Sequence, residues 1–124
     1  IPQPALAAFM ESGDFARHIR RMRRAYSTRQ KALLAALAAE AQGLLVAKPD
    51  PAGMHLIAKL TPDLAGRMTD RDVEARGAEA GVIARALSNY YTEGPPQQGL
   101  VLGYAGFDEA ALAVGVAKLA AALR

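Results

Sequence analysis

The residues best suited to metal or acid–base chemistry are few and scattered. The chain has two histidines, His18 and His55, and no cysteine. A catalytic zinc ion usually takes three protein ligands, and neither histidine has a clustered set of partners in the sequence. We therefore expect no metal site. The lack of cysteine also excludes disulfides and thiolate ligands, and it is compatible with a reducing compartment.

The loop expected over residues 88–99 holds the hydroxyl groups that could meet a ligand. Ser88 is followed by Asn89, Tyr90 and Tyr91, and no Gly-x-Ser-x-Gly elbow surrounds the serine. A nucleophilic role for Ser88 is therefore not expected. Serine and tyrosine on one loop suit polar contacts to a ligand. The plain alternative is a loop packed by its own tyrosines.

The lysines do not suggest covalent catalysis. A Schiff-base lysine must be desolvated and held in a pocket. Lys31 and Lys118 instead fit helix surfaces, and Lys48 precedes a turn. Lys59 lies on the more polar face of an expected strand. No glycine-rich loop opens a helix to hold a phosphate. We expect no catalytic residue in the chain.

The net charge is only +3, yet the basic residues crowd one stretch: Arg17, Arg20, Arg21, Arg23, Arg24, Arg29 and Lys31. Such a cluster could serve nucleic acid. The alternatives are a solvated helix face or a face paired with an acidic neighbour. A DNA-reading helix would need a compact helix-turn-helix around it. Because the apolar spacing continues for several turns beyond the arginines, we expect a packed scaffold helix.

Hydrophobic spacing and turn residues predict the elements that must position these groups. Helices are expected over 4–12, over 14–42 with Asp14 as N-cap, over 70–80 after Thr69, and after Asp108. Strands are expected over 44–48, 54–60, 82–87 and 100–105. Loops are expected around Pro62 and over 88–99. The last helix should bury Leu112, Val116, Leu119 and Leu123.

This order predicts an α+β fold. Short, mostly antiparallel strands with helices on one side form a two-layer sandwich, and 124 residues make one domain at most. Much of the apolar content is alanine, which buries little area per residue. The core should therefore depend on the few large side chains: Phe9, Phe15, Met22, Leu56, Ile57, Tyr90, Tyr91, Leu102, Tyr104 and Phe107.

The beginning of the chain suggests a segment of a longer protein. The sequence begins Ile1-Pro2-Gln3-Pro4, without an initiator methionine or a signal peptide. No apolar run approaches the roughly 20 residues that a membrane span needs. We expect a C-terminal fragment of a cytoplasmic protein that has no contact with membranes.

Residues 14–26, 52–56, 80–91 and 99–105 form four blocks of sequence. These blocks resemble the end of a fold-type-I aminotransferase-like domain. The most specific likeness is to MocR-type transcriptional regulators of the GntR superfamily. Blocks one and three, residues 14–26 and 80–91, are fairly specific for MocR-type proteins. Blocks two and four, residues 52–56 and 99–105, occur more widely among fold-type-I enzymes. The blocks follow the family order across nearly the whole chain.

The resemblance implies a two-part parent protein. A winged helix-turn-helix would bind DNA, and a linker would join it to an aminotransferase-like domain that binds pyridoxal phosphate. The cofactor lysine of that family lies upstream of Ile1, in the large lobe, so the isolated chain should bind no cofactor. The chain would be the small lobe, packed on the rest of the domain in a homodimer. DNA contact would come only through the missing N-terminal domain.

One residue departs from the aminotransferase pattern. Aminotransferases of this kind usually carry an arginine in block four that clamps the substrate carboxylate, because a guanidinium fork matches two oxygens. The matching residue here is Val101. This favours a sensor of cofactor or effector over an ordinary transaminase. Arg85, on a nearby expected strand, could take the missing role.

The resulting hypothesis is a regulatory small lobe without catalysis of its own. The residues expected to face the cofactor cleft or an effector are His55, Ser88, Tyr90, Tyr91 and Arg85. One alternative is the small domain of a working pyridoxal-phosphate-dependent aminotransferase. The other, from a different class, is a free-standing basic module that binds nucleic acid.

Overall fold

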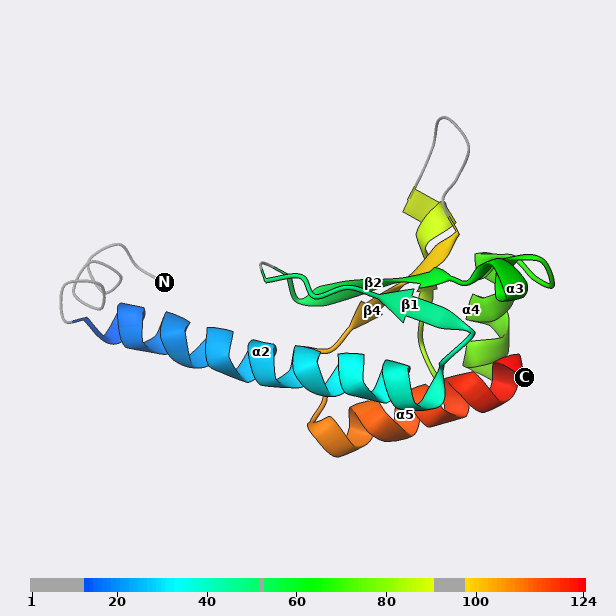
Figure 1. The fold of residues 1–124 in the computed structure, drawn as a ribbon. Helices are drawn as coiled ribbons and strands as arrows, with labels where there is room; N and C mark the ends of the chain where they lie inside the picture. Colours follow the sequence, from blue (N-terminus) through cyan, green and yellow to red (C-terminus); the bar gives the residue numbers. More distant parts are fainter. Residues whose placement is uncertain (1–12, 52, 91–97) are drawn as a thin grey trace.

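The computed structural model describes residues 13–51, 53–90 and 98–124 (Figure 1). The elements are α2 (Asp14–Glu40), β1 (Leu45–Ala47), β2 (His55–Leu60), α3 (Pro62–Ala65), α4 (Asp70–Glu79), β3 (Arg85–Ala86), the 3-10 helix η1 (Leu87–Tyr90), β4 (Gly99–Gly103) and α5 (Glu109–Leu123). The helix expected over 4–12 lies outside the described residues, as do Phe9 and Tyr91.

The four strands form one antiparallel sheet in the order β1-β2-β4-β3. Along β2 the side chains alternate between exposed and buried, with Leu56, Ala58 and Leu60 buried. Alternation of this kind is expected when only one face of a sheet is covered. In Figure 1, α2 and α5 run below the sheet on the same side. The predicted α+β two-layer fold is confirmed.

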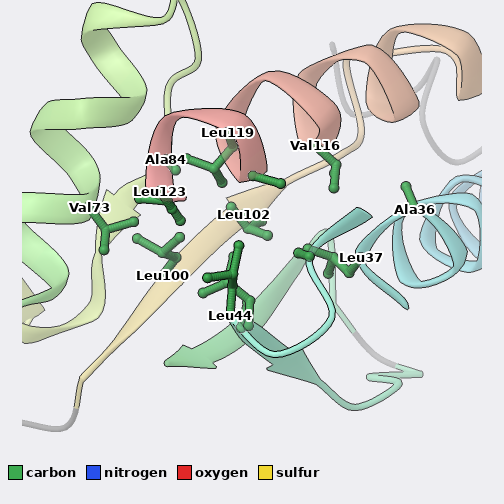
Figure 2. Packing of buried hydrophobic residues seen from close by; sticks show 14 of the residues in the cluster. Ala36, Leu37, Leu44, Val73, Ala84, Leu100, Leu102, Val116, Leu119 and Leu123 are labelled. Atoms are coloured by element: carbon green, nitrogen blue, oxygen red, sulfur yellow. The ribbon is translucent and has the colours of Figure 1, made fainter. Parts of the chain in front are cut away.

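The core lies between the covered face of the sheet and the helices α2, α4 and α5. Helix α5 packs on both α2 and α4. Figure 2 shows how side chains of these three helices meet those of β4: Leu37, Val73, Leu100, Leu102, Val116, Leu119 and Leu123. The four residues expected to face inward from the last helix are all buried. Their spacing of four, three and four residues places them on one side of a helix.

Helix capping agrees with the sequence at two helices and differs at a third. The side chain of Thr69 accepts a bond from the backbone N–H of Asp72, and that of Asp108 accepts one from Ala111 at 2.7 Å. The expectation that Asp14 caps α2 is wrong. Gly13 occupies the N-cap with a φ of +82°, and Asp14 is the first helical residue. A glycine adopts this left-handed conformation without steric cost.

Two connections differ from the expected elements. The segment after Thr61, expected as a loop, forms the short helix α3, because the Thr61 side chain caps it and Pro62 suits the first helical position. The strand expected over 82–87 shrinks to Arg85–Ala86. Only those two residues find partners on β4, and the chain turns into η1 at Leu87.

Several large side chains expected in the core are exposed. Leu56, Leu102 and Tyr104 are buried, but Phe15, Ile57, Tyr90 and Phe107 are exposed and Met22 is half-buried. Ile57 points away from the helices because it alternates with buried neighbours on β2. Phe15 and Met22 lie on the first half of α2, which extends beyond the sheet (Figure 1). The expected packed scaffold is confirmed for α2 from Tyr26 onward, where the helix lies against the core.

Tyr104 ties the end of β4 to the middle of α2. The Gln30 side-chain amide donates to the Tyr104 hydroxyl at 2.8 Å and to the Asp50 carbonyl at 2.6 Å. The Tyr104 hydroxyl in turn donates to the carbonyl of Gly53. Gln30 also accepts from the Asp50 backbone N–H at 3.0 Å. One buried glutamine and one buried tyrosine thus fix the turn between β1 and β2.

Replacing Tyr104 with phenylalanine should lower the free energy of unfolding by about 1–3 kcal/mol, because buried polar partners lose a bond. Urea unfolding followed by circular dichroism measures this loss. Tyr90→Phe is the matched control, since that tyrosine is exposed, and it should change stability very little. Equal effects of the two substitutions would contradict the role of this network.

Candidate functional site

The face of the sheet that the described helices do not cover is the candidate site, and we call it the open face. Its side chains come from all four strands. They are Val46 of β1, His55, Ile57 and Lys59 of β2, Val101 of β4 and Arg85 of β3. The set combines three apolar residues, two cations and an imidazole. Such a surface suits a ligand that carries both an apolar part and a negative charge.

Arg85 lies beside the residue that replaces the aminotransferase arginine. In the sheet register, Val101 pairs with Arg85 on one side and with Ile57 on the other. Directly opposite residues of antiparallel strands have Cβ atoms roughly 4.5–5.5 Å apart and point to the same face. Arg85 is exposed and Val101 is half-buried. The guanidinium of Arg85 can therefore reach the region in front of Val101.

His55 lies at the edge of the open face, opposite Gly103 in the register. A Cβ atom added to Gly103 would lie 3.4 Å from Cδ2 of the His55 ring, so the imidazole covers the glycine backbone closely. The ring is exposed. It is therefore available for a hydrogen bond with a ligand on this face.

Ser88 is part of a buried cluster around Asp70. The carboxylate of Asp70 is fully buried and accepts from the Ser88 hydroxyl at 2.6 Å and from the Ser88 backbone N–H at 2.9 Å. It also accepts from the backbone N–H of Gly99 at 3.2 Å. The Asp70 N–H donates to the Gln98 side chain at 2.7 Å. We call this cluster the Asp70 clip; it holds both ends of the segment 88–99.

The sequence reasoning missed Asp70. The available signal was the position of this acid in the first turn of a helix capped by Thr69, where a carboxylate is favoured by the helix dipole. Its contacts with Ser88 and Gly99 span 18 and 29 residues, and local patterns cannot reveal them. The hydroxyl proton of Ser88 is engaged by the clip, whereas Tyr90, two residues on, is exposed.

Helix α4, which supplies Asp70, is stabilised by a capping box. The backbone N–H of Thr69 donates to the Asp72 carboxylate at 2.9 Å, and the Thr69 side chain adds a second bond. These bonds hold the pKa of Asp72 below its usual value. A lowered folded-state pKa stabilises the fold above the unfolded pKa. The capping contribution should therefore disappear as the pH falls through the lowered pKa.

The described residues do not by themselves form a cofactor pocket. All four lysines are exposed to solvent, whereas a lysine that binds pyridoxal phosphate covalently must be enclosed. Residues 13–51, 53–90 and 98–124 contain no group of three metal-binding side chains. Within the same ranges, no helix is both long and apolar enough to cross a membrane. The open face could supply one wall of a pocket.

The chain is similar in sequence to bacterial regulators. It is 40% identical over 121 residues to a probable rhizopine catabolism regulatory protein, MocR, of Rhizobium meliloti. It is 31% identical over 117 residues to the uncharacterized HTH-type transcriptional regulator YhdI of Bacillus subtilis. These alignments cover 97% and 94% of the chain, which spans about a quarter of each relative (24%). No family model matches the chain.

The fold is shared with solved aminotransferases. The α-aminoadipate aminotransferase LysN of Thermus thermophilus superposes with a TM-score of 0.80 at 25% identity, over 95% of this chain and 29% of that one. A kynurenine aminotransferase of Pyrococcus horikoshii gives 0.76 at 21%, over 93% and 28%. The predicted resemblance is therefore confirmed: the chain is similar in sequence to a segment of MocR-type regulators and has the fold of a segment of aminotransferases.

Proposed function

We propose that the chain is the C-terminal small lobe of an aminotransferase-like sensing domain in a cytoplasmic transcriptional regulator. The parent protein would bind pyridoxal phosphate in its large lobe and DNA through a separate N-terminal domain, and it would act as a homodimer. The observation that carries the proposal is the 40% identity to a regulator across nearly the whole chain, on an aminotransferase fold.

In this proposal the open face is the wall that the small lobe turns toward the cofactor. Bound pyridoxal phosphate supplies an electrophilic carbonyl that captures amino groups. Arg85 and His55 would bind the polar groups of the effector, while Ile57 and Val101 would exclude water from its apolar part. The Asp70 clip would hold the segment that carries Tyr90 and Tyr91, which would contribute hydroxyl contacts.

A working aminotransferase is the second candidate, favoured by the superposition with LysN. The residue at position 101 opposes it, because valine cannot bind the carboxylate that an arginine would clamp. Regulation requires only that an effector change the conformation of the cofactor domain. Turnover requires in addition that substrate be held in one orientation through the reaction.

The test uses the intact parent protein. Purified parent should acquire the visible absorption of bound pyridoxal phosphate, and it should shift a DNA fragment from its own promoter region. Failure of both would remove the proposal. Sustained amino-group transfer between an amino acid and an oxo acid, without promoter binding, would favour the aminotransferase instead.

Arg85→Gln in the cofactor-loaded parent should weaken its spectral response to carboxylate-bearing amino acids by about 10-fold or more. A hydrogen bond to a charged group contributes about 1.5–3 kcal/mol, and 1.4 kcal/mol is a factor of ten. A panel of amino acids titrated against the visible spectrum measures the change. Lys118→Gln is the control, because Lys118 is exposed on α5, on the side of the sheet away from the open face. An unchanged midpoint in Arg85→Gln would exclude this role.

A further inference from the structure

The first half of α2 carries four exposed arginines on one side of the helix. The beginning of α2 extends beyond the sheet and beyond α5 (Figure 1), whereas Tyr26 already packs against the core. Arg17, Arg20, Arg21 and Arg24 are all exposed there. Positions separated by three, four and seven residues share one side of a helix. We call this side the basic stripe.

Acids on this helix lie at its two ends, Asp14 and Glu40, and Asp14 is three residues before Arg17. No aspartate or glutamate occurs between residues 15 and 39. Like charges three and four residues apart on a helix destabilise it, and a cation in the first turn also opposes the helix dipole. This repulsion raises the free energy of the helix. A bound anion would relieve it, because the anion neutralises the positive charges.

The opposite side of the same helix half is apolar. Phe15 is exposed, and Ile19 and Met22 are half-buried. Further along, Leu33 and Leu37 continue this side into the core. Exposed apolar surface is the side that the rest of a larger domain would cover. The basic stripe then faces outward, where a partner from outside the domain can reach it.

We propose that the basic stripe binds the phosphate groups of duplex DNA. Arg17 and Arg24 are separated by about 10 Å along the axis, at roughly 1.5 Å per residue. Long arginine side chains along this length can contact phosphates of neighbouring nucleotides on the duplex. The exposed cations are all arginines, whose planar guanidinium groups bind phosphate in a bidentate manner. The choice of DNA over other polyanions rests on the proposed function.

The consequence is a second DNA contact besides the reading domain of the parent. Contacts to phosphate carry no sequence information, but they raise affinity and fix the position of a protein on the duplex. The stripe would therefore bind DNA of any sequence next to the site that the parent reads. This contact departs from the expectation that DNA is bound only through the N-terminal domain.

The test is fluorescence anisotropy with the full 124-residue chain and a fluorescein-labelled random-sequence duplex. The triple variant Arg20→Gln, Arg21→Gln, Arg24→Gln should bind at least about 10-fold more weakly at low salt. Its slope of log affinity against log salt should fall by about 2–3, since each phosphate contact contributes about 0.9. The control Lys48→Gln, Arg76→Gln, Lys118→Gln removes the same charge from other exposed sites and should change neither quantity substantially.

Three results would overturn the proposal. They are equal weakening by both triple variants, no binding of the unaltered chain at low salt, and tighter binding of poly-glutamate than of DNA, which would indicate an acidic protein partner. Circular dichroism checks that α2 remains helical in each variant. None of these results bears on cofactor uptake by the parent, so this inference and the proposed function fail separately.

Discussion

Replacing Asp70 with alanine is expected to lower the free energy of unfolding by about 3–5 kcal/mol. The carboxylate is fully buried and accepts three hydrogen bonds. Its removal leaves the backbone N–H groups of Ser88 and Gly99 without an acceptor in the interior, and each such group is costly. Urea unfolding followed by circular dichroism would measure the loss as a lower midpoint at an unchanged slope.

Ser88→Ala is the matched control for the clip, because it removes one of the three bonds and leaves both backbone contacts in place. It should cost about 1–2 kcal/mol. Hydrogen exchange should also speed up at the Ser88 and Gly99 amides in Asp70→Ala, since both lose their acceptor. If Asp70→Ala lowered the free energy of unfolding by less than Ser88→Ala does, the clip would not hold the segment.

Leu56→Ala should cost about 2–5 kcal/mol, the usual range for a buried leucine that leaves a cavity. Leu56 is fully buried in the middle of β2 and pairs with Leu102 in the register. The neighbouring Ile57 offers a control on the same strand, because it points to the open face and is 47% exposed. Ile57→Ala should change the stability of this chain by less than about 1 kcal/mol.

Comparable losses from the two substitutions would mean that the open face is covered in solution, for instance by self-association. Light scattering on both variants would then detect the association directly. If Leu56→Ala alone is strongly destabilising, the sheet has one covered face and one free face. The free face is what the proposed cofactor cleft requires.

Sequence patterns predicted the elements that are held by local contacts. Helix α5 follows from the Asp108 cap and the regular spacing of four apolar residues, and β2 follows from strict alternation. The two open-face candidates Arg85 and His55 also follow from strand positions. These features depend on neighbours within a few residues, where period and capping are informative.

The rest depended on contacts distant in sequence, or on surfaces that the described residues leave partly exposed. The Asp70 clip joins residues that are separated by 18 and 29 positions in the sequence. Because of these contacts Ser88, which was expected on a loop, is buried. The first turns of α2 have core-like apolar spacing, yet Phe15 is exposed and Ile19 and Met22 are only half-buried. Periodicity reports which side of a helix is apolar, but not whether the covering element is present.

The order of strands in the sheet has a consequence for how the protein is made. Strand β4 lies between β2 and β3, although both of its neighbours precede it in the chain. A ribosome synthesises the N-terminal part first. One edge of β2 therefore has no strand partner until β4 has been synthesised. Unpaired strand edges attract other chains. The growing chain is therefore more exposed to aggregation before β4 and α5 have been synthesised than after they have paired and packed.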